Sequence, residues 1–234
     1  MTNVDATITS ALKRSTLFRT SPAEILKRLA LSSTTCAISR GEYLFRAGGS
    51  GTGVYVLSKG CLAITVGTPE LHKVIEMAGV GAEVGLAAAL LGVDETVNAE
   101  ALADCSLILI PRSALLACAA ENSQLAMLVA AALGRQVQML ITDIEAYSLQ
   151  SGRQRVAEYL EHLASSNWSR IKPFTLPAKK SVIASKLSLT PEYFSRVLHE
   201  LISVGGISVN GRQITVLNPM RLRQDDASAA GTAQ

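Results

Sequence analysis

Three side chains with the chemistry to read DNA bases lie close together in the segment SLTPEYFSRVLHEL, residues 188–201. Glu192, Ser195 and Arg196 place an acid, a hydroxyl and a guanidinium near the start of one expected helix. Arginine can donate two hydrogen bonds to guanine O6 and N7, glutamate can accept one from cytosine N4, and serine can adapt to either role. We therefore expect this segment to read base edges in the major groove. The alternative is a surface helix with an incidental Glu192–Arg196 ion pair.

The local sequence predicts that this helix begins at Pro191. Thr190 is a suitable N-cap, and proline is favoured at the first helical position because an N–H there would have no helical partner. An apolar stripe at i, i+3, i+4 and i+7 predicts a buried face that leaves the three polar side chains outside. The stripe consists of Phe194, Val197, Leu198 and Leu201.

The neighbouring segments predict a winged helix-turn-helix domain over residues 151–223. KKSVIASKL predicts a short helix, SLT predicts a tight turn, and the Asn210-Gly211 pair between two β-rich runs predicts a hairpin. In this motif the second helix enters the major groove by its N-terminal end. We expect further side chains of this domain to bind or support the phosphate backbone: Lys179, Lys180, Lys186, Thr190, Tyr193 and Arg212.

The charge distribution favours the same kind of partner. The chain of 234 residues has a net charge of only +3, but residues 170–223 contain nine bases and two acids, a balance of +7. The rest of the chain has 13 bases and 17 acids. A basic segment on an acidic body predicts a polyanion as partner. The aromatic content of 4% argues against a platform that stacks single-stranded bases.

Residues 1–112 predict an N-terminal helical segment followed by a β-roll. Glycines recur between short strand-like runs such as GVYVLS, CLAITV and CSLILI, which is typical of a barrel or jelly roll. The fold class expected for the chain is therefore α+β. Before the roll, SPAE at residues 21–24 predicts a capping box in which Ser21 caps a helix.

Residues 113–150 predict a long helix with a narrow apolar seam. Leu133, Val137, Leu140, Ile144 and Tyr147 are spaced 4, 3, 4 and 3 residues apart. This is the pattern of a helix that pairs with a second copy of itself, so a homodimer is expected; packing against the β-roll is the alternative. Residues 224–234 predict a flexible tail.

The sequence disfavours a membrane protein. No apolar run has the form of a signal peptide, and Gly134, Arg135 and Gln136 interrupt the alanine-rich run near residue 130. We therefore expect a cytoplasmic protein without a membrane partner.

An iron–sulfur cluster and a metalloenzyme are disfavoured as well. The four cysteines are far apart and form no C-x-x-C motif, so buried thiols are expected in place of an iron–sulfur cluster. An enzyme of the cupin type needs several histidine or carboxylate ligands that converge in the roll, and His72 is the only histidine there. We therefore do not expect an enzyme. The cysteines are Cys36, Cys61, Cys105 and Cys118.

Several stretches together resemble the Crp/Fnr superfamily of bacterial transcription regulators. RGEYLFRAGGSGTGVYVLSKGCLAI resembles the start of its β-roll, ALADCSLILIPRSAL resembles the exit from the roll, and TPEYFSRVLHELISVGGISVNGRQITVLN resembles its winged helix. The resemblance implies a cyclic-nucleotide-binding-like sensor domain, a homodimer paired along the central helix, and a two-fold symmetric site in double-stranded DNA. RNA polymerase is an implied partner if the protein activates transcription. The pattern E-x-x-S-R is similar to the Fnr branch, which implies half-sites of the TTGAT type.

The resemblance also locates a candidate effector pocket in AEVGLAAALLGVDETVNAEA, residues 82–101. In cyclic-nucleotide-binding members a Gly-Glu pair holds the ribose, and an Arg followed by Ser or Thr holds the phosphate. Glu83 matches the ribose glutamate, but Glu95 stands at the arginine position before Thr96. Because a carboxylate repels a phosphate, we do not expect cyclic AMP to bind tightly.

The nature of the signal stays open at this point. The run that starts at Gly85 and Leu86, GLAAALLGV, would suit an apolar ligand. Some members of the superfamily sense nitric oxide or carbon monoxide through haem, so a Dnr-like haem sensor with His72 as axial ligand is one hypothesis. An ordinary turn residue is the simpler interpretation of His72. A thiol-redox signal is a further hypothesis, and so is an effector-independent regulator with a degenerate pocket.

Overall fold

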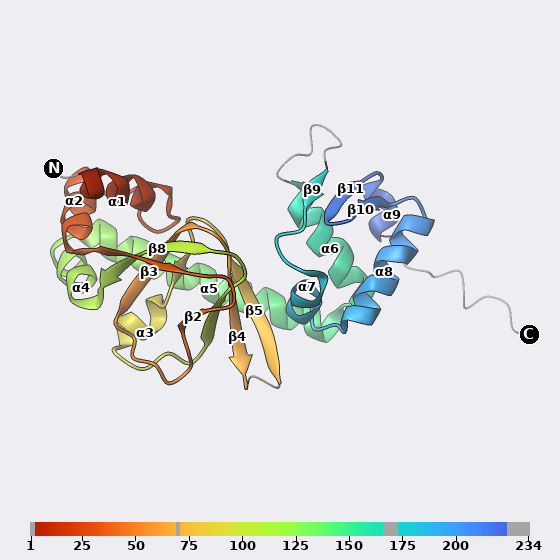
Figure 1. Ribbon diagram of the computed structural model, residues 1–234, viewed down its shortest axis with the longest axis horizontal. Coiled ribbons are helices and arrows are strands. Elements are labelled where there is room, and N and C mark those ends of the chain that lie inside the picture. Colours follow the sequence, from red (N-terminus) through yellow and green to blue (C-terminus); the bar gives the residue numbers. More distant parts are fainter. Residues whose placement is uncertain (1–2, 69–70, 166–172, 224–234) are drawn as a thin grey trace, which may run out of the picture. The chain divides into compact units, whose positions relative to one another are not determined.

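The computed structural model describes residues 3–68, 71–165 and 173–223. The predicted tail 224–234 lies outside these residues. The chain divides into two compact units, residues 1–140 and residues 141–234. Unit 1 is a β-roll with helices, and unit 2 is a small mixed domain, so the α+β class predicted from the sequence is confirmed (Figure 1).

Unit 1 builds its roll from two four-stranded antiparallel sheets, with strand orders β1-β8-β3-β6 and β2-β7-β4-β5. The elements of unit 1 are α1 (Asn3–Arg14), α2 (Ala23–Ser32), β1 (Thr34–Ile38), β2 (Tyr43–Phe45), β3 (Gly53–Lys59), β4 (Leu62–Gly67), β5 (His72–Ala78), β6 (Glu83–Val84), α3 (Leu86–Leu91), β7 (Asn98–Ala101), β8 (Cys105–Pro111), α4 (Arg112–Glu121) and the larger part of α5 (Ser123–Leu149).

The strands β3 and β8 are covered on both faces, and their sequence shows why. Successive side chains of a strand point to opposite faces. On β3, Leu57 packs into the roll interior, whereas Val54 and Val56 pack against the helices. On β8, Leu107 faces inward, and Ile108 packs with the helical side. Helices α1, α2 and α4 supply this helical side, and they lie together beside β3 and β8 (Figure 1).

The predicted capping box at Ser21 is not formed. Helix α2 begins at Ala23, and its N-cap is Pro22 with ψ 145°, which supplies no side-chain cap. Ser21 lies one residue further out, where its N–H donates to the Phe18 carbonyl in a turn. Its buried side-chain oxygen has no hydrogen-bond partner among the described residues. The capping prediction is therefore wrong, because the turn before Pro22 carries Ser21 away from the first helical N–H groups.

The helical stretch predicted over residues 113–150 consists of two helices. Asn122 ends α4 with φ −134° and ψ 101°, outside the helical region. Its side-chain oxygen accepts a hydrogen bond from the Leu125 N–H at 2.8 Å, which caps the start of α5. Leu125 itself is buried in the unit 1 core.

Helix α5 is 27 residues long and, by length and composition alone, could cross a membrane. Gly134, Arg135 and Gln136 do not interrupt this helix. By length and composition, the expectation that no stretch has the form of a membrane span is therefore wrong. Only 17% of its most apolar window is buried. Most of this apolar window is thus exposed in the chain by itself.

Unit 2 begins with the last turns of α5 and ends with a short helix. Its three-stranded antiparallel sheet has the order β10-β11-β9. The elements are α6 (Gly152–Ser165), β9 (Phe174–Thr175), α7 (Lys180–Lys186), α8 (Pro191–Ser203), β10 (Ile207–Asn210), β11 (Gln213–Val216) and α9 (Pro219–Arg223). The order of α7, turn, α8 and hairpin agrees with the predicted winged helix-turn-helix.

Candidate functional site

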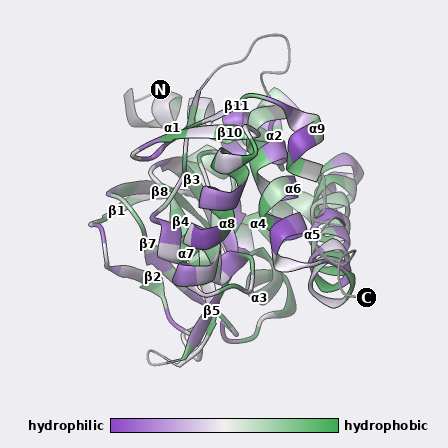
Figure 2. Cartoon of the chain, turned by 90° about the vertical axis from the view of Figure 1, so that its right-hand side faces the viewer, coloured by the Kyte–Doolittle hydropathy of each residue, from purple (hydrophilic) through white to green (hydrophobic). Residues whose placement is uncertain are grey.

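The helix α8 begins where the sequence predicts. Thr190 is its N-cap, and the Thr190 side-chain oxygen accepts a hydrogen bond from the Tyr193 N–H at 3.2 Å. Pro191 follows at the first helical position. The predicted apolar stripe is buried, which fixes the rotation of the helix about its axis. The buried side chains are Phe194, Val197, Leu198 and Leu201. Figure 2 shows hydrophilic and hydrophobic segments alternating along α8.

The turn that joins α7 to α8 is sharp. The Ser188 N–H donates to the Ser185 carbonyl at 3.0 Å, and the Leu189 N–H donates to the Ala184 carbonyl at 2.9 Å. Ser188 has φ 55° and is the only residue other than glycine with positive φ in the described part of the chain. This left-handed residue reverses the chain direction at the end of α7 and provides donors for its last carbonyls.

The three predicted base-reading side chains lie on the first two turns of α8. Glu192 and Arg196 are exposed, and Ser195 is half-buried. The Arg196 side chain is 66% exposed; its Nε lies 3.8 Å from Glu200 Oε1, and its guanidinium carbon lies 4.7 Å from the centre of the Tyr193 ring. Arg196 therefore forms its ion pair with Glu200, one turn further along the helix, and not with Glu192. An exposed pair of this kind contributes about 1 kcal/mol or less, so a DNA base can compete for the guanidinium.

The predicted phosphate-binding lysines differ in their surroundings. Lys179 is exposed at the N-cap of α7, and Lys180 is half-buried in its first turn. Lys186 differs from both, because its ammonium group forms an ion pair with the Asp143 carboxylate of α5. The side chains of this pair are only 16% and 25% exposed. The geometry favours an internal role for Lys186 over a phosphate contact.

The wing holds Arg212 at its tip, but part of its guanidinium is engaged. Asn210 pairs with Gln213, so the two-residue loop consists of Gly211 and Arg212. Gly211 has φ 60°, which suits a residue without Cβ. Arg212 Nη2 donates to the Leu176 carbonyl at 2.6 Å, which ties the tip to the chain beyond β9. The remaining donors of this exposed arginine are available to a phosphate.

The predicted effector residues differ in their surroundings. Glu83 lies on β6, and its Oε1 accepts a hydrogen bond from the Leu17 N–H at 2.7 Å. Burial raises the pKa of Glu83, whereas hydrogen bonds from Leu17 and Ser15 act in the opposite direction. The N-terminal segment therefore uses the carboxylate that would hold a ribose. Leu86 is buried in the helical core of unit 1, and Thr96 is exposed.

Glu95 and Gly85 do lie together. Glu95 is only 6% exposed, and its Oε1 lies 3.0 Å from the position that a Cβ would take at Gly85. The backbone of Glu95 bonds to Gly48 and Gly49, at 2.7 Å in both cases. Burial alone raises the pKa of the Glu95 carboxyl. This carboxyl has no hydrogen-bond or ion-pair partner within the described ranges.

Among the residues with metal or redox chemistry, Cys61 and Cys105 are neighbours. His72 is exposed at the start of β5, opposite Gly67 of β4. The described residues contain no group of three or more His, Cys, Asp or Glu side chains that could hold a metal ion. Burial raises the pKa of all four cysteine thiols, which are free. The Cys105 thiol donates to the Ala103 and Cys61 carbonyls at 3.1 and 3.5 Å.

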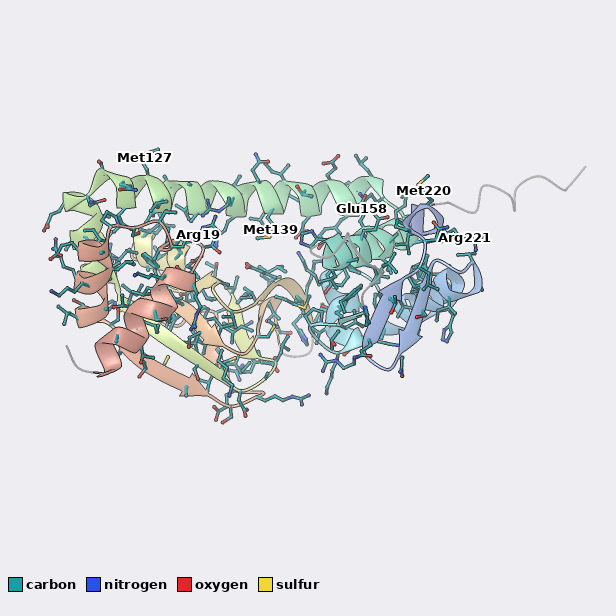
Figure 3. All side chains as sticks on the ribbon, turned by 90° about the horizontal axis from the view of Figure 1, so that it is seen from above. Arg19, Met127, Met139, Glu158, Met220 and Arg221 are labelled. Carbon is teal, nitrogen blue, oxygen red and sulfur yellow. The ribbon has the colours of Figure 1, made fainter. Side chains whose placement is uncertain are left out.

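The residues of the predicted seam on α5 differ in exposure. Val137, Leu140 and Ile144 are exposed, but Leu133 packs against the core of unit 1. Ile141 is also exposed, at 52%. Other exposed apolar side chains of the helix are Met127, Met139 and Leu149; Met127 points away from the rest of its unit in Figure 3.

Tyr147, the last residue of the predicted seam, is engaged within its own unit. Its hydroxyl donates to the Lys186 carbonyl at 2.7 Å. Two neighbours of this tyrosine, Asp143 and Arg155, were not among the site residues predicted from the sequence. The first turn of α6 is an unfavourable place for a cation because of the helix dipole. Arg153 and Arg155 both lie there, and this misfit is the signal in the sequence that could have drawn attention to Arg155.

Comparisons with known proteins agree with this architecture. A family model of the cyclic nucleotide-binding domain matches residues 36–122, and a family model of the Crp-like helix-turn-helix domain matches residues 154–225. The nitrogen fixation regulation protein FixK of Azorhizobium caulinodans is 30% identical over 135 residues, which cover 56% of this chain and 54% of FixK. The match thus spans about half the length of this curated relative.

Solved structures with the same fold cover more of the chain. FixK2 of Bradyrhizobium japonicum has a TM-score of 0.74 at 24% identity, with 84% of this chain and 98% of that chain covered. A putative cyclic nucleotide binding protein of Ruegeria pomeroyi has a TM-score of 0.62 at 25% identity, with 93% and 96% covered. The two domain matches lie in sequence order on either side of α5. The chain belongs to the Crp/Fnr family of transcription regulators, which are not enzymes.

Proposed function

We propose that this protein is a homodimeric, sequence-specific DNA-binding transcription regulator that works in the cytoplasm. The observation that carries the proposal is the set of side chains on the first two turns of α8. Glu192 and Arg196 are exposed there, Ser195 lies between them, and the Thr190 cap with the buried stripe holds the helix in one orientation. Glutamate can pair with cytosine, arginine with guanine, and serine with either base.

The target we propose is a two-fold symmetric site with TTGAT-type half-sites. The pattern of Glu192, Ser195 and Arg196 supports such a half-site through its similarity to the Fnr branch. Lys179, Lys180 and the free donors of Arg212 would contact phosphates beside it. RNA polymerase would be a further partner if the protein activates transcription.

The dimer would form along α5. Gly134, Val137, Ile141 and Ile144 are spaced 3, 4 and 3 residues apart, which is the repeat of a paired helix, and the three apolar side chains among them are exposed. Leu140 lies beside this seam and is 50% exposed. A helix partner explains why so long and apolar a helix is so little buried in its own chain. The glycine would let the two backbones approach closely.

The sensor domain would respond to a signal other than a cyclic nucleotide. Glu83 is already bound to the N-terminal segment, and Glu95 places a carboxylate where a phosphate would need a cation. A small apolar molecule, haem with a gas, or a redox change are the remaining signal classes. The engagement of Glu83 favours a second candidate, a regulator with a degenerate pocket that needs no effector.

The experiment that tests the DNA-binding proposal is fluorescence anisotropy with purified protein and two labelled duplexes. One duplex carries two TTGAT-type half-sites, and the other has the same composition in scrambled order, at the same stated salt concentration. We expect Arg196→Ala to cost about 1–3 kcal/mol on the first duplex and to flatten the preference at one base pair.

Lys180→Ala is the matched control, because a phosphate contact carries no sequence information. We expect it to weaken both duplexes alike and to reduce the salt slope by about one. Equal losses on both duplexes for Arg196→Ala would refute base reading. The wild type is also measured with added haem and in reduced and oxidised form; a preference below about tenfold in every state would refute sequence-specific binding.

A further inference from the structure

Polar groups from α5 and α6 converge on the end of α7, directly before the turn that leads into α8. The Tyr147 hydroxyl donates to the Lys186 carbonyl at 2.7 Å, and Arg155 Nε donates to the Leu187 carbonyl at 2.9 Å. The Asp143 carboxylate binds the Lys186 ammonium group. We call Asp143, Tyr147 and Arg155 the carbonyl clamp.

The clamp binds groups that a helix end leaves without partners. The last carbonyls of any α-helix lack an intrahelical N–H donor, and cations are favoured there by the helix dipole. At the end of α7 the turn supplies donors for the Ala184 and Ser185 carbonyls, and Tyr147 and Arg155 supply donors for the Lys186 and Leu187 carbonyls. The clamp therefore attaches α7 at the point where its backbone turns toward the reading helix.

Arg155 attaches two helix ends at once. Besides the Leu187 carbonyl, its Nη1 donates to the Gln150 carbonyl at 2.9 Å and lies 3.5 Å from the Ala146 carbonyl, both at the end of α5. Its guanidinium carbon lies 5.8 Å from the centre of the Tyr147 ring. One planar guanidinium group thus joins the C-terminal ends of α5 and α7.

The surroundings make these contacts strong enough to fix an angle. Asp143 and Tyr147 are half-buried, and the side chains of Lys186 and Asp143 are only 16% and 25% exposed. Salt screens a partly buried ion pair much less than an exposed one. A planar guanidinium with several simultaneous acceptors also has few alternative positions.

We infer that Asp143, Tyr147 and Arg155 are positioning residues that set the angle of α7 and α8 on the last two turns of α5. The inference rests on the proposed function, because the angle matters only if two reading helices of a dimer must meet two half-sites. Half-sites on one face of DNA lie about one helical turn apart. A small rotation of α8 about the end of α5 would change the distance between the two reading helices.

The test separates binding of one half-site from binding of two. Tyr147→Phe removes one hydroxyl and keeps the ring, and Asp143→Asn removes the charge that holds Lys186. Glu145→Gln is the matched control, an exposed acid on the same helix. Each variant and the wild type are titrated with duplexes that carry one half-site, two half-sites at the preferred spacing, and two half-sites with one or two base pairs inserted.

We expect Tyr147→Phe to bind the properly spaced double site about 3- to 10-fold more weakly, because the hydroxyl loses its bond to the Lys186 carbonyl and its bond with the Ser188 side chain. Asp143→Asn should lose about tenfold or more, because Lys186 is left half-buried without its partner. Binding of the single half-site should stay within about twofold of wild type, since a single reading unit needs no fixed angle. The preference for one spacing should flatten in both variants and remain sharp in Glu145→Gln.

Equal losses on single and double sites, with the spacing preference intact, would overturn the inference and leave a structural role for these residues. Unchanged double-site binding in both variants would overturn it as well. A third outcome is distinguishable from these two. If the wild type does not distinguish the double site from scrambled DNA, the proposed function is refuted, and the inference that rests on it is refuted as well. Sedimentation of each variant verifies that the dimer is unchanged.

Discussion

Replacing Glu95 with glutamine should stabilise the protein at neutral and higher pH. Glu95 as a residue is 6% exposed, and its carboxyl has no hydrogen-bond or ion-pair partner within residues 3–68, 71–165 and 173–223. A buried polar group without a partner costs about 1–3 kcal/mol, and an ionised one costs more than a neutral one. Glutamine has nearly the same shape and carries no charge, so it should recover about 1–3 kcal/mol of the free energy of unfolding.

The effect should depend on pH, and the sign follows from proton linkage. Burial raises the pKa of Glu95 in the folded state above its unfolded value. Below the unfolded pKa both states are protonated, and Glu95→Gln should have little effect. As the pH rises toward and through the folded pKa, the unfolded chain holds fewer protons than the folded one, and wild-type stability falls. The advantage of glutamine should therefore grow from acidic to neutral pH and then stay constant.

The assay is thermal unfolding of the wild type and the variant between pH 4 and pH 8 at constant ionic strength. For a chain of this size, 1 kcal/mol shifts the midpoint temperature by about 2–4 °C. Asp94→Asn is the control, because it removes the same charge from an exposed neighbour. A lower midpoint for Glu95→Gln at pH 8, or a shift that does not change with pH, would contradict a buried, unpaired carboxylate.

The other predictions concern the dimer, the thiols and the wing. Val137→Glu should give monomers in analytical ultracentrifugation at micromolar concentration, since it puts a charge in the exposed seam; an unchanged dimer would show that the seam is misassigned. Burial raises the pKa of the Cys105 thiol, so iodoacetamide should modify it more slowly than free cysteine at pH 8, and rapid labelling found by mass spectrometry would argue for a reactive thiol. Arg212→Met should weaken specific and scrambled DNA alike and lower the midpoint of unfolding by a few degrees, because the Leu176 carbonyl loses its donor. Loss of sequence preference in this variant would instead assign Arg212 to base reading.

The sequence by itself determined the features that depend on neighbours a few residues apart. The cap at Thr190, the start at Pro191 and the buried stripe of α8 follow from helix geometry, because hydrogen bonds and side-chain contacts in a helix join residues three or four apart. Asn210-Gly211 predicted the hairpin after α8, but Asn210 ends β10, and the two-residue loop consists of Gly211, with its positive φ, and Arg212. These features made the reading helix and its polar side chains recognisable.

Only the tertiary structure decided which polar side chains have partners inside the protein. Lys186 has the sequence context of a phosphate contact, but the chain folds so that Asp143, 43 residues earlier, binds its ammonium group. Tyr147 fits a dimer seam by its spacing, yet its hydroxyl reaches the Lys186 carbonyl. Glu83 matches a ribose-binding residue by position, but its carboxylate accepts a hydrogen bond from the Leu17 N–H. Each of these pairings joins residues that are far apart in the chain, so no local pattern can encode it, and burial in a folded domain sets its strength.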